Sequence, residues 1–427
     1  MIKRSFIGLT KPMIKYEALE STPPEPKHVQ TPKKITLFID TPYDYKDSLL
    51  LSVGDHVKTG QKLSYSEDND AYVISSATGT ISSITSILGD YGKSYTAVTI
   101  DTDENDKMDD HFTALGKDPT FDTAINYLAG IPGTPSFNRF TDSESSIHTI
   151  IICGVDSDLY ITTNQYILKA ELDAIGNGIR ILKDIIQVDH VIIGVPESLM
   201  QDAAVLGTEV RTVNAEYPAA LPHLMIKSFT GQAVPVGKNF EDIGICFFTA
   251  EAVASIGKAF GSGSIPVTKT LTFIDKNENK TLVSARIGTP VSEILDAFDI
   301  TLDEKDRIVF GGPMAGSAIY SKDYPILSDT DAIIIQAKDK LDHISDYPCI
   351  NCGDCIRTCP ASVPVNMLVR LLEAGQYEEA SDQYDLYSCI ECGLCSYICA
   401  AKIPIFHYIK LAKYELDQIR TAEAMNA

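Results

Sequence analysis

The sequence predicts a multidomain α/β protein, and three observations support that fold class. The chain has 427 residues, which is enough for roughly two to four domains with large cores. Apolar runs typical of strands alternate with helical patterns over residues 116–262, which favours a parallel sheet with helices on both faces. Eight of the ten cysteines lie between Cys349 and Cys399, which indicates a separate cysteine-rich domain.

The first two segments predict an arm and a small β-domain. Residues 1–34 are rich in Pro and Lys with little periodicity, and we expect an extended arm. Residues 35–115 contain short strand patterns, and Ser52–Leu63 followed by Ala77–Ile81 resembles the barrel-sandwich (hammerhead) fold of lipoyl and biotinyl domains. The modifiable lysine of those domains is missing, because the matching hairpin tip reads Asp68-Asn-Asp-Ala71. We therefore expect a structural role.

The segment over residues 116–262 predicts a Rossmann-like α/β domain. Helical spacing runs from Asn164 to Ile186. Ligands of such folds bind at the carboxyl ends of strands, here near Gly154–Tyr160 and Phe248–Ala252. Cys153 and Cys246 lie in apolar runs and are interpreted as buried structural thiols. The predicted strands are His148–Gly154, Val188–Val195, Thr208–Val213 and Ile243–Phe248.

The last two segments predict a ubiquitin-like unit and an α-helical domain. Over residues 263–340, a hairpin from Thr268 to Ser284 precedes a short helix with Pro290 near its first turn. Over residues 341–427 the apolar spacing is helical, which favours an α-helical rather than a β-rich cluster domain. The predicted helices of that domain are Val365–Ala374, Tyr377–Gln383 and Ile403–Ile419.

Two copies of the pattern C-x2-C-x2-C-x3-C carry the chemistry of the chain. This spacing wraps thiolates around a [4Fe–4S] cluster, and in two-cluster ferredoxins the fourth cysteine of each copy ligates the other cluster. Zinc or disulfides are the alternatives, but the doubled pattern exceeds what one zinc needs. We therefore predict two [4Fe–4S] clusters. Cluster 1 is assigned to Cys349, Cys352, Cys355 and Cys399, and cluster 2 to Cys389, Cys392, Cys395 and Cys359.

The composition excludes several other classes of function. The chain has 36 Lys plus Arg against 58 Asp plus Glu, a formal charge of -22, which disfavours direct binding of nucleic acid or anionic lipid. It has neither a signal-peptide pattern nor a run of about 18 apolar residues, so we expect a soluble chain in a reducing compartment. Neither a Ser–His–Asp pattern nor a paired-carboxylate motif stands out. Electron transfer is therefore predicted, with no sign of bond-making chemistry.

The order of these units resembles the RnfC family, the peripheral iron–sulfur subunits of Rnf ion-translocating electron-transport complexes. The resemblance implies membrane and iron–sulfur partner subunits, a ferredoxin-like electron carrier, and a peripheral position at the cytoplasmic face of the membrane. Its α/β and ubiquitin-like (SLBB) units also resemble those of the flavin-bearing subunit of respiratory complex I. The motifs that carry the resemblance are Val53–Gln61, Arg286–Val291, Gly311–Gly316, the two cysteine motifs and the tail Lys402–Lys413.

The nucleotide pocket departs from the family pattern in four places. The glycine-rich loop falls at Gly130-Ile-Pro-Gly133-Thr-Pro, where the prolines remove backbone donors. The acidic segment E-C-E-P-Y reads Asp156-Ser-Asp158-Leu-Tyr160, and the remaining pocket would comprise Gly130, Gly133, Asp156 and Asp158. The segment Y-P-x-G-G-E has become Tyr217–Pro222, and a helix-opening asparagine has become Phe248. These changes predict that FMN and NAD binding has been lost.

The resulting prediction is an electron-transfer subunit of a membrane-associated Rnf-type complex. It would relay electrons through two [4Fe–4S] clusters between a soluble low-potential donor such as ferredoxin and membrane redox subunits. Direct NAD use is not expected, as would suit an archaeal-type Rnf complex. Two alternatives stay open: an FMN-containing NADH dehydrogenase module of the complex, and a soluble RnfC-like electron donor to a reductase such as proline reductase.

Overall fold

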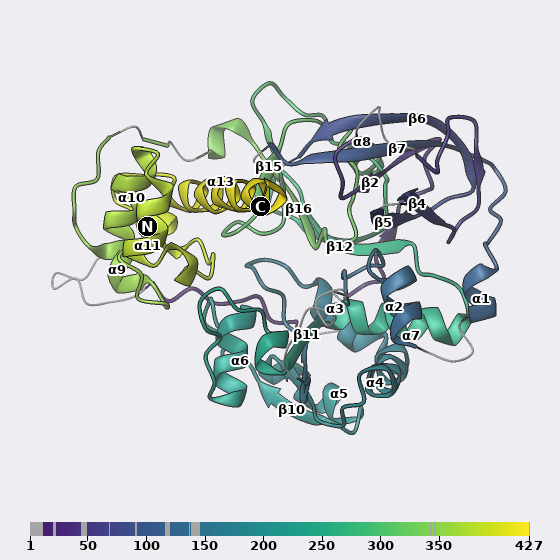
Figure 1. The fold of residues 1–427 in the computed structure, drawn as a ribbon, viewed down its shortest axis with the longest axis horizontal. Helices are drawn as coiled ribbons and strands as arrows, with labels where there is room; N and C mark the ends of the chain where they lie inside the picture. The colour runs from purple at the N-terminus through teal and green to yellow at the C-terminus, as the bar shows by residue number, and fades with distance from the viewer. Residues whose placement is uncertain are drawn as a thin grey trace.

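A computed structural model of the chain describes most of its residues and confirms the multidomain α/β class. The described residues are 12–19, 23–43, 49–67, 69–89, 92–115, 120–135, 137, 146–341, 344–345 and 347–426. Figure 1 shows the helical cysteine-rich domain at the left, the α/β unit below, and the β-rich units at the upper right.

The barrel-sandwich unit is built from an antiparallel sheet and a hairpin. Its sheet has the order β2-β7-β6-β3, and β4 pairs with β5 beside it. Alternate residues of β2, including Ile35 and Leu37, point into the core of this unit. The predicted tip residue Asp68 lies outside the described residues. The elements are β2 (Lys34–Ile39), β3 (His56–Val57), β4 (Lys62–Ser66), β5 (Asn69–Ile74), β6 (Gly79–Leu88) and β7 (Ser94–Thr102).

The α/β unit contains the predicted parallel sheet. The strand order is β10-β9-β8-β11, with every pair parallel. All residues of β8 and β9 are buried, because helices cover both faces of the sheet. The strands are β8 (Thr149–Cys153), β9 (Val191–Val195), β10 (Glu209–Thr212) and β11 (Ile245–Thr249).

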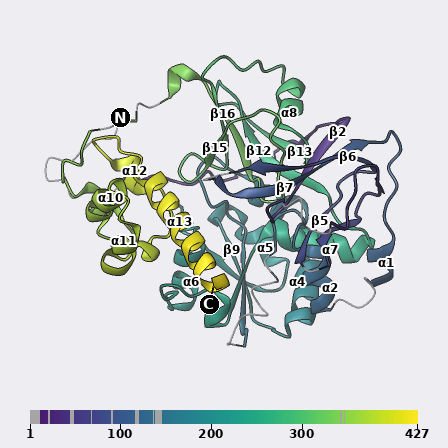
Figure 2. The ribbon, with the colours of Figure 1, turned by 45° about the horizontal axis from the view of Figure 1, so that its top comes forward.

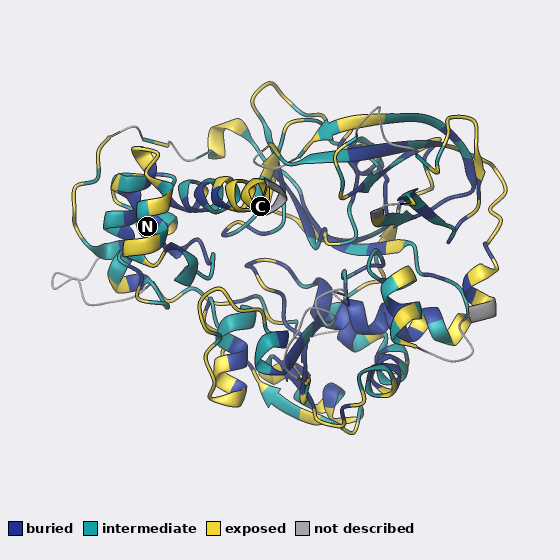
Figure 3. Cartoon of the chain, viewed as in Figure 1, coloured by how far each residue is buried: buried dark blue, intermediate teal, exposed yellow. Residues whose placement is uncertain are grey.

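The helices of this unit differ from the prediction at one point. The expected helix from Asn164 to Ile186 is two helices, because the backbone leaves helical geometry at Glu171. They are α3 (Thr163–Ala170) and α4 (Leu172–Ile186), followed by η3 (Glu197–Leu199), α5 (Met200–Ala204), α6 (Pro222–Thr230), η4 (Glu241–Ile243) and α7 (Ala250–Ser262); α1 (His111–Leu115) and α2 (Phe121–Leu128) precede the sheet. Figure 3 shows that α3 and α7 are largely buried.

The ubiquitin-like unit is organised around a mixed six-stranded sheet. The strand order is β1-β13-β12-β16-β14-β15, and the predicted hairpin forms its β12–β13 pair. The N-terminal arm adds β1 in parallel to β13, and Lys15 forms a β-bridge with Glu216 of the α/β unit. The arm therefore joins two units. The elements are β1 (Lys27–His28), β12 (Thr268–Ile274), β13 (Lys280–Arg286), α8 (Val291–Ala297), β14 (Arg307–Phe310), β15 (Ser317–Ile319), β16 (Ala332–Gln336) and η5 (Lys338–Lys340).

The cysteine-rich domain is helical, as expected, and its two halves repeat each other. The second cysteine motif begins at Cys389, 40 residues after Cys349, and each motif leads into a short helix and then a longer one. In Figure 2 the last helix runs from this domain toward α6. The helices are α9 (Asp354–Thr358), α10 (Val365–Glu373), α11 (Tyr377–Tyr384), η6 (Leu386–Ser388), α12 (Leu394–Ile398) and α13 (Ile405–Asn426).

Candidate metal centres and nucleotide pocket

One cavity of the helical domain is lined by all four cysteines predicted for cluster 1. Cys349 and Cys352 come from the loop that leads into α9, and Cys355 lies in the first turn of that helix. The fourth, Cys399, follows α12 in the second half of the repeat. The apolar side chains of Val369, Ile403 and Ile405 complete the wall. The fold therefore brings the fourth cysteine of one motif to the first three of the other.

The cysteines predicted for cluster 2 also lie close together. Burial raises the pKa of the Cys392 thiol to about 12, and the negative charges of Cys389 and Cys359 act in the same direction. Cys359 of the first motif and Cys389 of the second pack against the same apolar core as Cys395. Cys395 is buried in the first turn of α12, and its thiol pKa is also raised by burial and by Cys389 and Cys392.

A single zinc ion and a [4Fe–4S] cluster need different spacings of the cysteine sulfurs. A tetrahedral zinc with Zn–S bonds of about 2.3 Å holds its sulfurs about 3.8 Å apart, whereas a cubane binds each thiolate at a separate iron. Away from the cysteine motifs, three potential ligand atoms lie within 4.8 Å of one another at Asp109, Asp110 and His111.

Left-handed backbone shapes both cysteine loops in the same way. Asn351 and Glu391, each two residues after the first cysteine of its motif, have φ of 55° and 57°. Gly353 and Gly393 follow with φ of 76° and 70°. A Cβ added at Gly393 would lie 2.1 Å from the carbonyl oxygen of Met314. Glycine at this position therefore lets the second loop approach the Gly311–Gly316 turn of the ubiquitin-like unit.

The two predicted clusters have different surroundings. Cys392 belongs to the same apolar core as Met314 and Tyr217, and the Tyr217 hydroxyl donates a buried hydrogen bond of 2.7 Å to the Cys392 carbonyl. In the first motif Cys352 is exposed, and its neighbour Ile350 is 65% exposed. The second motif is thus packed against the α/β unit, whereas the first motif reaches the surface.

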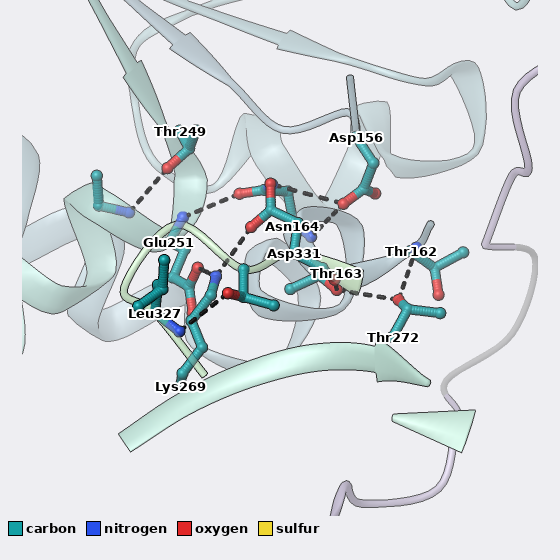
Figure 4. Close-up of polar contacts among 12 residues, drawn as sticks. Asp156, Thr162, Thr163, Asn164, Thr249, Glu251, Lys269, Thr272, Leu327 and Asp331 are labelled. Carbon is teal, nitrogen blue, oxygen red and sulfur yellow. Dashed lines mark hydrogen bonds and ion pairs between the residues drawn. The ribbon is translucent and has the colours of Figure 1, made fainter. Parts of the chain in front are cut away.

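The backbone donors at the expected phosphate site are used within the protein. The Gly133 N–H donates to the Ser328 carbonyl at 2.9 Å. At the start of α7, the Glu251 N–H donates to Asn164 Oδ1 at 3.2 Å, and the Ala252 N–H donates to Thr249 Oγ1 at 3.1 Å (Figure 4). Phosphates bind helix N-termini through such N–H groups. In this chain the protein's own oxygens accept from them.

The two pocket glycines have different environments. A Cβ added at Gly133 would lie 2.4 Å from the Ala252 nitrogen, so this glycine allows the loop to pack on the start of α7. Nothing lies within 4 Å of the corresponding point at Gly130. The residue that caps α7 is Thr249, while Phe248 lies inside β11 with its side chain in the core.

The two acidic residues of the expected pocket bind different parts of the chain. Asp156 is buried and accepts hydrogen bonds from the Asn164 N–H at 2.8 Å and from Gln165 Nε2 at 3.2 Å. Burial raises the pKa of Asp156 to about 6. Asp158 accepts from the backbone N–H groups of Met314 and Ala315 at 3.2 and 2.8 Å. Asp156 therefore stabilises the start of α3, and Asp158 attaches the ubiquitin-like unit to the α/β unit.

A buried ion network lies beside this site, and sequence reasoning did not find it. Lys269 is 0% exposed and contacts the carboxylates of Glu251 and Asp331, the latter at 2.8 Å (Figure 4). Burial alone would lower the pKa of Lys269, but the two carboxylates raise it overall. The three residues come from α7, β12 and the residue before β16. The sequence feature that could have revealed this network is a lysine within the apolar pattern of β12.

The cavity at the carboxyl edge of the sheet is acidic. It has a volume of about 320 Å³ and lies between Ser157–Asp158 and the Gly311–Ser317 turn. Asp158, Asp329 and Asp331 line it, and the described lining residues include no Lys, Arg or His. Lys269 offsets part of the charge of Asp331, and the remaining carboxyl groups oppose entry of a phosphate group.

Comparisons with known proteins agree with this architecture. Residues 10–105 match the RnfC barrel sandwich hybrid domain, residues 128–258 the Nuo51 FMN-binding domain, and residues 342–400 the 4Fe-4S dicluster domain. The chain is 27% identical over 379 residues to the C subunit of the ion-translocating oxidoreductase complex of Buchnera aphidicola, covering 83% of this chain and 78% of that protein. Over most of its length the chain is thus similar to RnfC, the C subunit of ion-translocating oxidoreductase complexes.

Two further relatives are longer than this chain. The corresponding proteins of Pectobacterium carotovorum and Klebsiella pneumoniae are each 26% identical, over 79% and 93% of this chain. The chain spans 48% and 55% of their lengths, about half. Among its described residues, no helix combines the length and apolarity needed to cross a bilayer.

Two solved structures of an NAD+-reducing [NiFe]-hydrogenase are also similar. The air-oxidized form has a TM-score of 0.43 and 13% identity, covering 63% of this chain and 56% of that chain. The H2-reduced form has a TM-score of 0.45 and 12% identity, covering 73% and 63%. Both scores are below 0.5, so the description of the fold rests on the chain's own elements.

Proposed function

We propose that this chain is the electron-transfer subunit of an Rnf-type ion-translocating complex. It relays electrons through two [4Fe–4S] clusters between a soluble low-potential donor, such as ferredoxin, and membrane redox subunits. The observation that supports this most is the shared cavity of Cys349, Cys352, Cys355 and Cys399, which needs both halves of the repeat. Cluster 1 is held by those four, and cluster 2 by Cys389, Cys392, Cys395 and Cys359.

The difference in exposure suggests where a partner would approach. Cys352 is exposed, and Tyr347 and Ile350 beside it are 78% and 65% exposed. Exposed apolar side chains around a redox centre suit contact with another protein. In this proposal the iron–sulfur subunit of the complex meets the chain at cluster 1, and the chain is peripheral at the cytoplasmic face of the membrane.

The proposal includes that the α/β unit holds neither FMN nor NAD. The segment 128–258 matches an FMN-binding family model, but its residues do not fit a bound phosphate. The Gly133 and Glu251 N–H groups already donate to Ser328 and Asn164. The adjacent cavity is lined by three carboxyl groups. The unit would instead form the support against which cluster 2 is packed.

Cofactor content of the anaerobically purified full chain tests this function. Iron and acid-labile sulfide should each be about eight per chain, the content of two cubanes, and acid extraction should release no flavin. About four irons per chain, or iron without sulfide, would remove the two-cluster assignment. Copurification with integral membrane subunits separates the proposal from a soluble electron donor to a reductase.

The second candidate is an FMN-containing NADH dehydrogenase module of the same complex. The match of residues 128–258 to the Nuo51 FMN-binding domain favours it. The two candidates share the clusters and differ in the flavin. Stoichiometric FMN in the cofactor extract would favour this second candidate, and would leave the cluster ligands unchanged.

A further inference from the structure

The two halves of the cysteine repeat fasten their loops with different chemistry. In the first half, Asn351 Oδ1 accepts a hydrogen bond of 2.9 Å from Asn366 Nδ2 of α10. In the second half, the matching residue Glu391 accepts from Lys413 Nζ of α13 at 2.7 Å. Because the two halves of the repeat are offset by 40 residues, the position in the first half that matches Lys413 is Glu373, which is exposed at the end of α10. The first loop also has a cation, because Arg357 pairs with Asp354 and donates to the Cys352 carbonyl at 3.1 Å, but its side chain is 49% exposed. The two loops therefore differ in how far their cation is buried.

Lys413 also contacts a predicted cluster ligand directly. Its Nζ donates to the backbone carbonyl of Cys389 at 2.8 Å, and its side chain is only 16% exposed. Glu391, the counter-charge, is 39% exposed and therefore more strongly screened by water. The positive member of the pair is thus the one less screened by water.

The other charges near Lys413 do not cancel it. His223 of α6 faces it, and burial together with the charge of Lys413 lowers the pKa of that imidazole, which keeps His223 neutral at pH 7. Asp417 accepts a hydrogen bond from the Tyr387 hydroxyl, and Arg420 stacks on the same ring at 4.5 Å. Asp417 and Arg420, one and two turns beyond Lys413 on α13, therefore place opposite charges at the same tyrosine.

We propose that Lys413 raises the reduction potential of cluster 2 above that of cluster 1. Reduction adds one negative charge to a cluster, and a largely buried cation stabilises that charge strongly because water screens it little. Cluster 1 has the neutral amides of Asn351 and Asn366 at the equivalent place, and the cation at its loop, Arg357, is 49% exposed and therefore more strongly screened by water than Lys413. This inference rests on the proposed two-cluster function. A single electron entering the chain would then reside mainly on the buried cluster.

Three variants of the full, cluster-loaded chain test the proposal by EPR-monitored redox titration. Lys413→Met removes the charge, Lys413→Arg keeps it, and Glu391→Gln removes the counter-charge while its amide oxygen can still accept from Lys413. Lys413→Met should lower the upper midpoint by about 59 mV, a tenfold change in the ratio of reduced to oxidised cluster for one electron. The lower midpoint should stay in place, so the two midpoints converge.

The other two variants keep the test independent of folding defects. Lys413→Arg should retain the separation of the midpoints, and Glu391→Gln should widen it. If Lys413 acts electrostatically, Lys413→Met and Glu391→Gln should shift the midpoint of cluster 2 in opposite directions. A loosened loop would shift that midpoint in the same direction in both variants. Shifts of the same sign in Lys413→Met and Glu391→Gln, or no shift in either, would overturn the role of Lys413. Fewer than about eight irons in the unmodified chain would instead count against the two-cluster function itself.

Discussion

The first cysteine motif lies at the surface of the helical domain, whereas the second is packed against the α/β and ubiquitin-like units. Both have the same spacing and the same left-handed residues, at Asn351 and Glu391. Their neighbours differ, since Cys352 is exposed and Cys392 is buried beneath Tyr217. Local sequence thus determines how each loop can hold a metal cluster. Tertiary packing determines whether that cluster faces a partner or the protein interior.

The largest expected effect comes from breaking the exchange of ligands between the halves. Cys399→Ala removes a residue of the second motif but should abolish cluster 1, so iron falls from about eight to about four per chain. Cys352→Ala should also leave only the EPR signal of cluster 2. Cys359→Ala and Cys395→Ala should both leave only the EPR signal of cluster 1. Cys246→Ala, a buried thiol outside the motifs, is the control and should keep both clusters. If Cys399→Ala and Cys395→Ala left the same signal, each motif would hold its own cluster.

The two motif glycines provide the next largest difference. An alanine at either position adopts left-handed backbone at a cost of about 1–2 kcal/mol. Gly393→Ala also places a methyl group 2.1 Å from the Met314 carbonyl oxygen, and overpacking adds about 1–3 kcal/mol. At Gly353 the nearest atom is the flexible end of Arg357 at 3.2 Å. Loss of cluster absorption should need clearly less urea in Gly393→Ala than in Gly353→Ala. Equal urea midpoints for the two variants would mean that the second loop does not depend on its contact with the Gly311–Gly316 turn.

A pair of tyrosine variants should give the smallest difference. Tyr217→Phe leaves the buried Cys392 carbonyl without the hydroxyl donor found 2.7 Å away, which costs about 1–3 kcal/mol. Tyr347→Phe, on the exposed first loop, should change stability by less than about 0.5 kcal/mol. Thermal unfolding followed by cluster absorption measures both. A stability loss in Tyr347→Phe as large as that in Tyr217→Phe would contradict the asymmetry between the motifs.

Features with a local cause could be predicted from the sequence. The apolar runs around Ile150 and Ile193 predict buried parallel strands, because both faces of such strands are covered. The stripe from Ile405 to Leu416 predicts the last helix, which extends further, to Asn426. The cysteine spacing predicts which sulfurs come together. The ligand assignments and the domain bounds stay predictions.

Features that depend on distant contacts could not be predicted. Ser328 covers the Gly133 N–H, and Lys269 joins Glu251 to Asp331, through segments far apart in the chain. The lost glycines and the two added prolines indicated that the pocket had changed. They did not show which groups would accept hydrogen bonds from its backbone N–H donors. The burial of the second motif depends on Tyr217 and Met314, which belong to other units. No periodicity within the motif could show it.

The central claim is that electrons pass through two clusters in a chain that no longer uses a nucleotide. The most direct measurement adds a reductant to the anaerobic, cluster-loaded chain and follows the visible absorption of its clusters. An excess of a reduced ferredoxin-type carrier should bleach that absorption rapidly, and NADH alone should leave it unchanged. Rapid bleaching by NADH, especially if added FMN enhances it, would contradict the account.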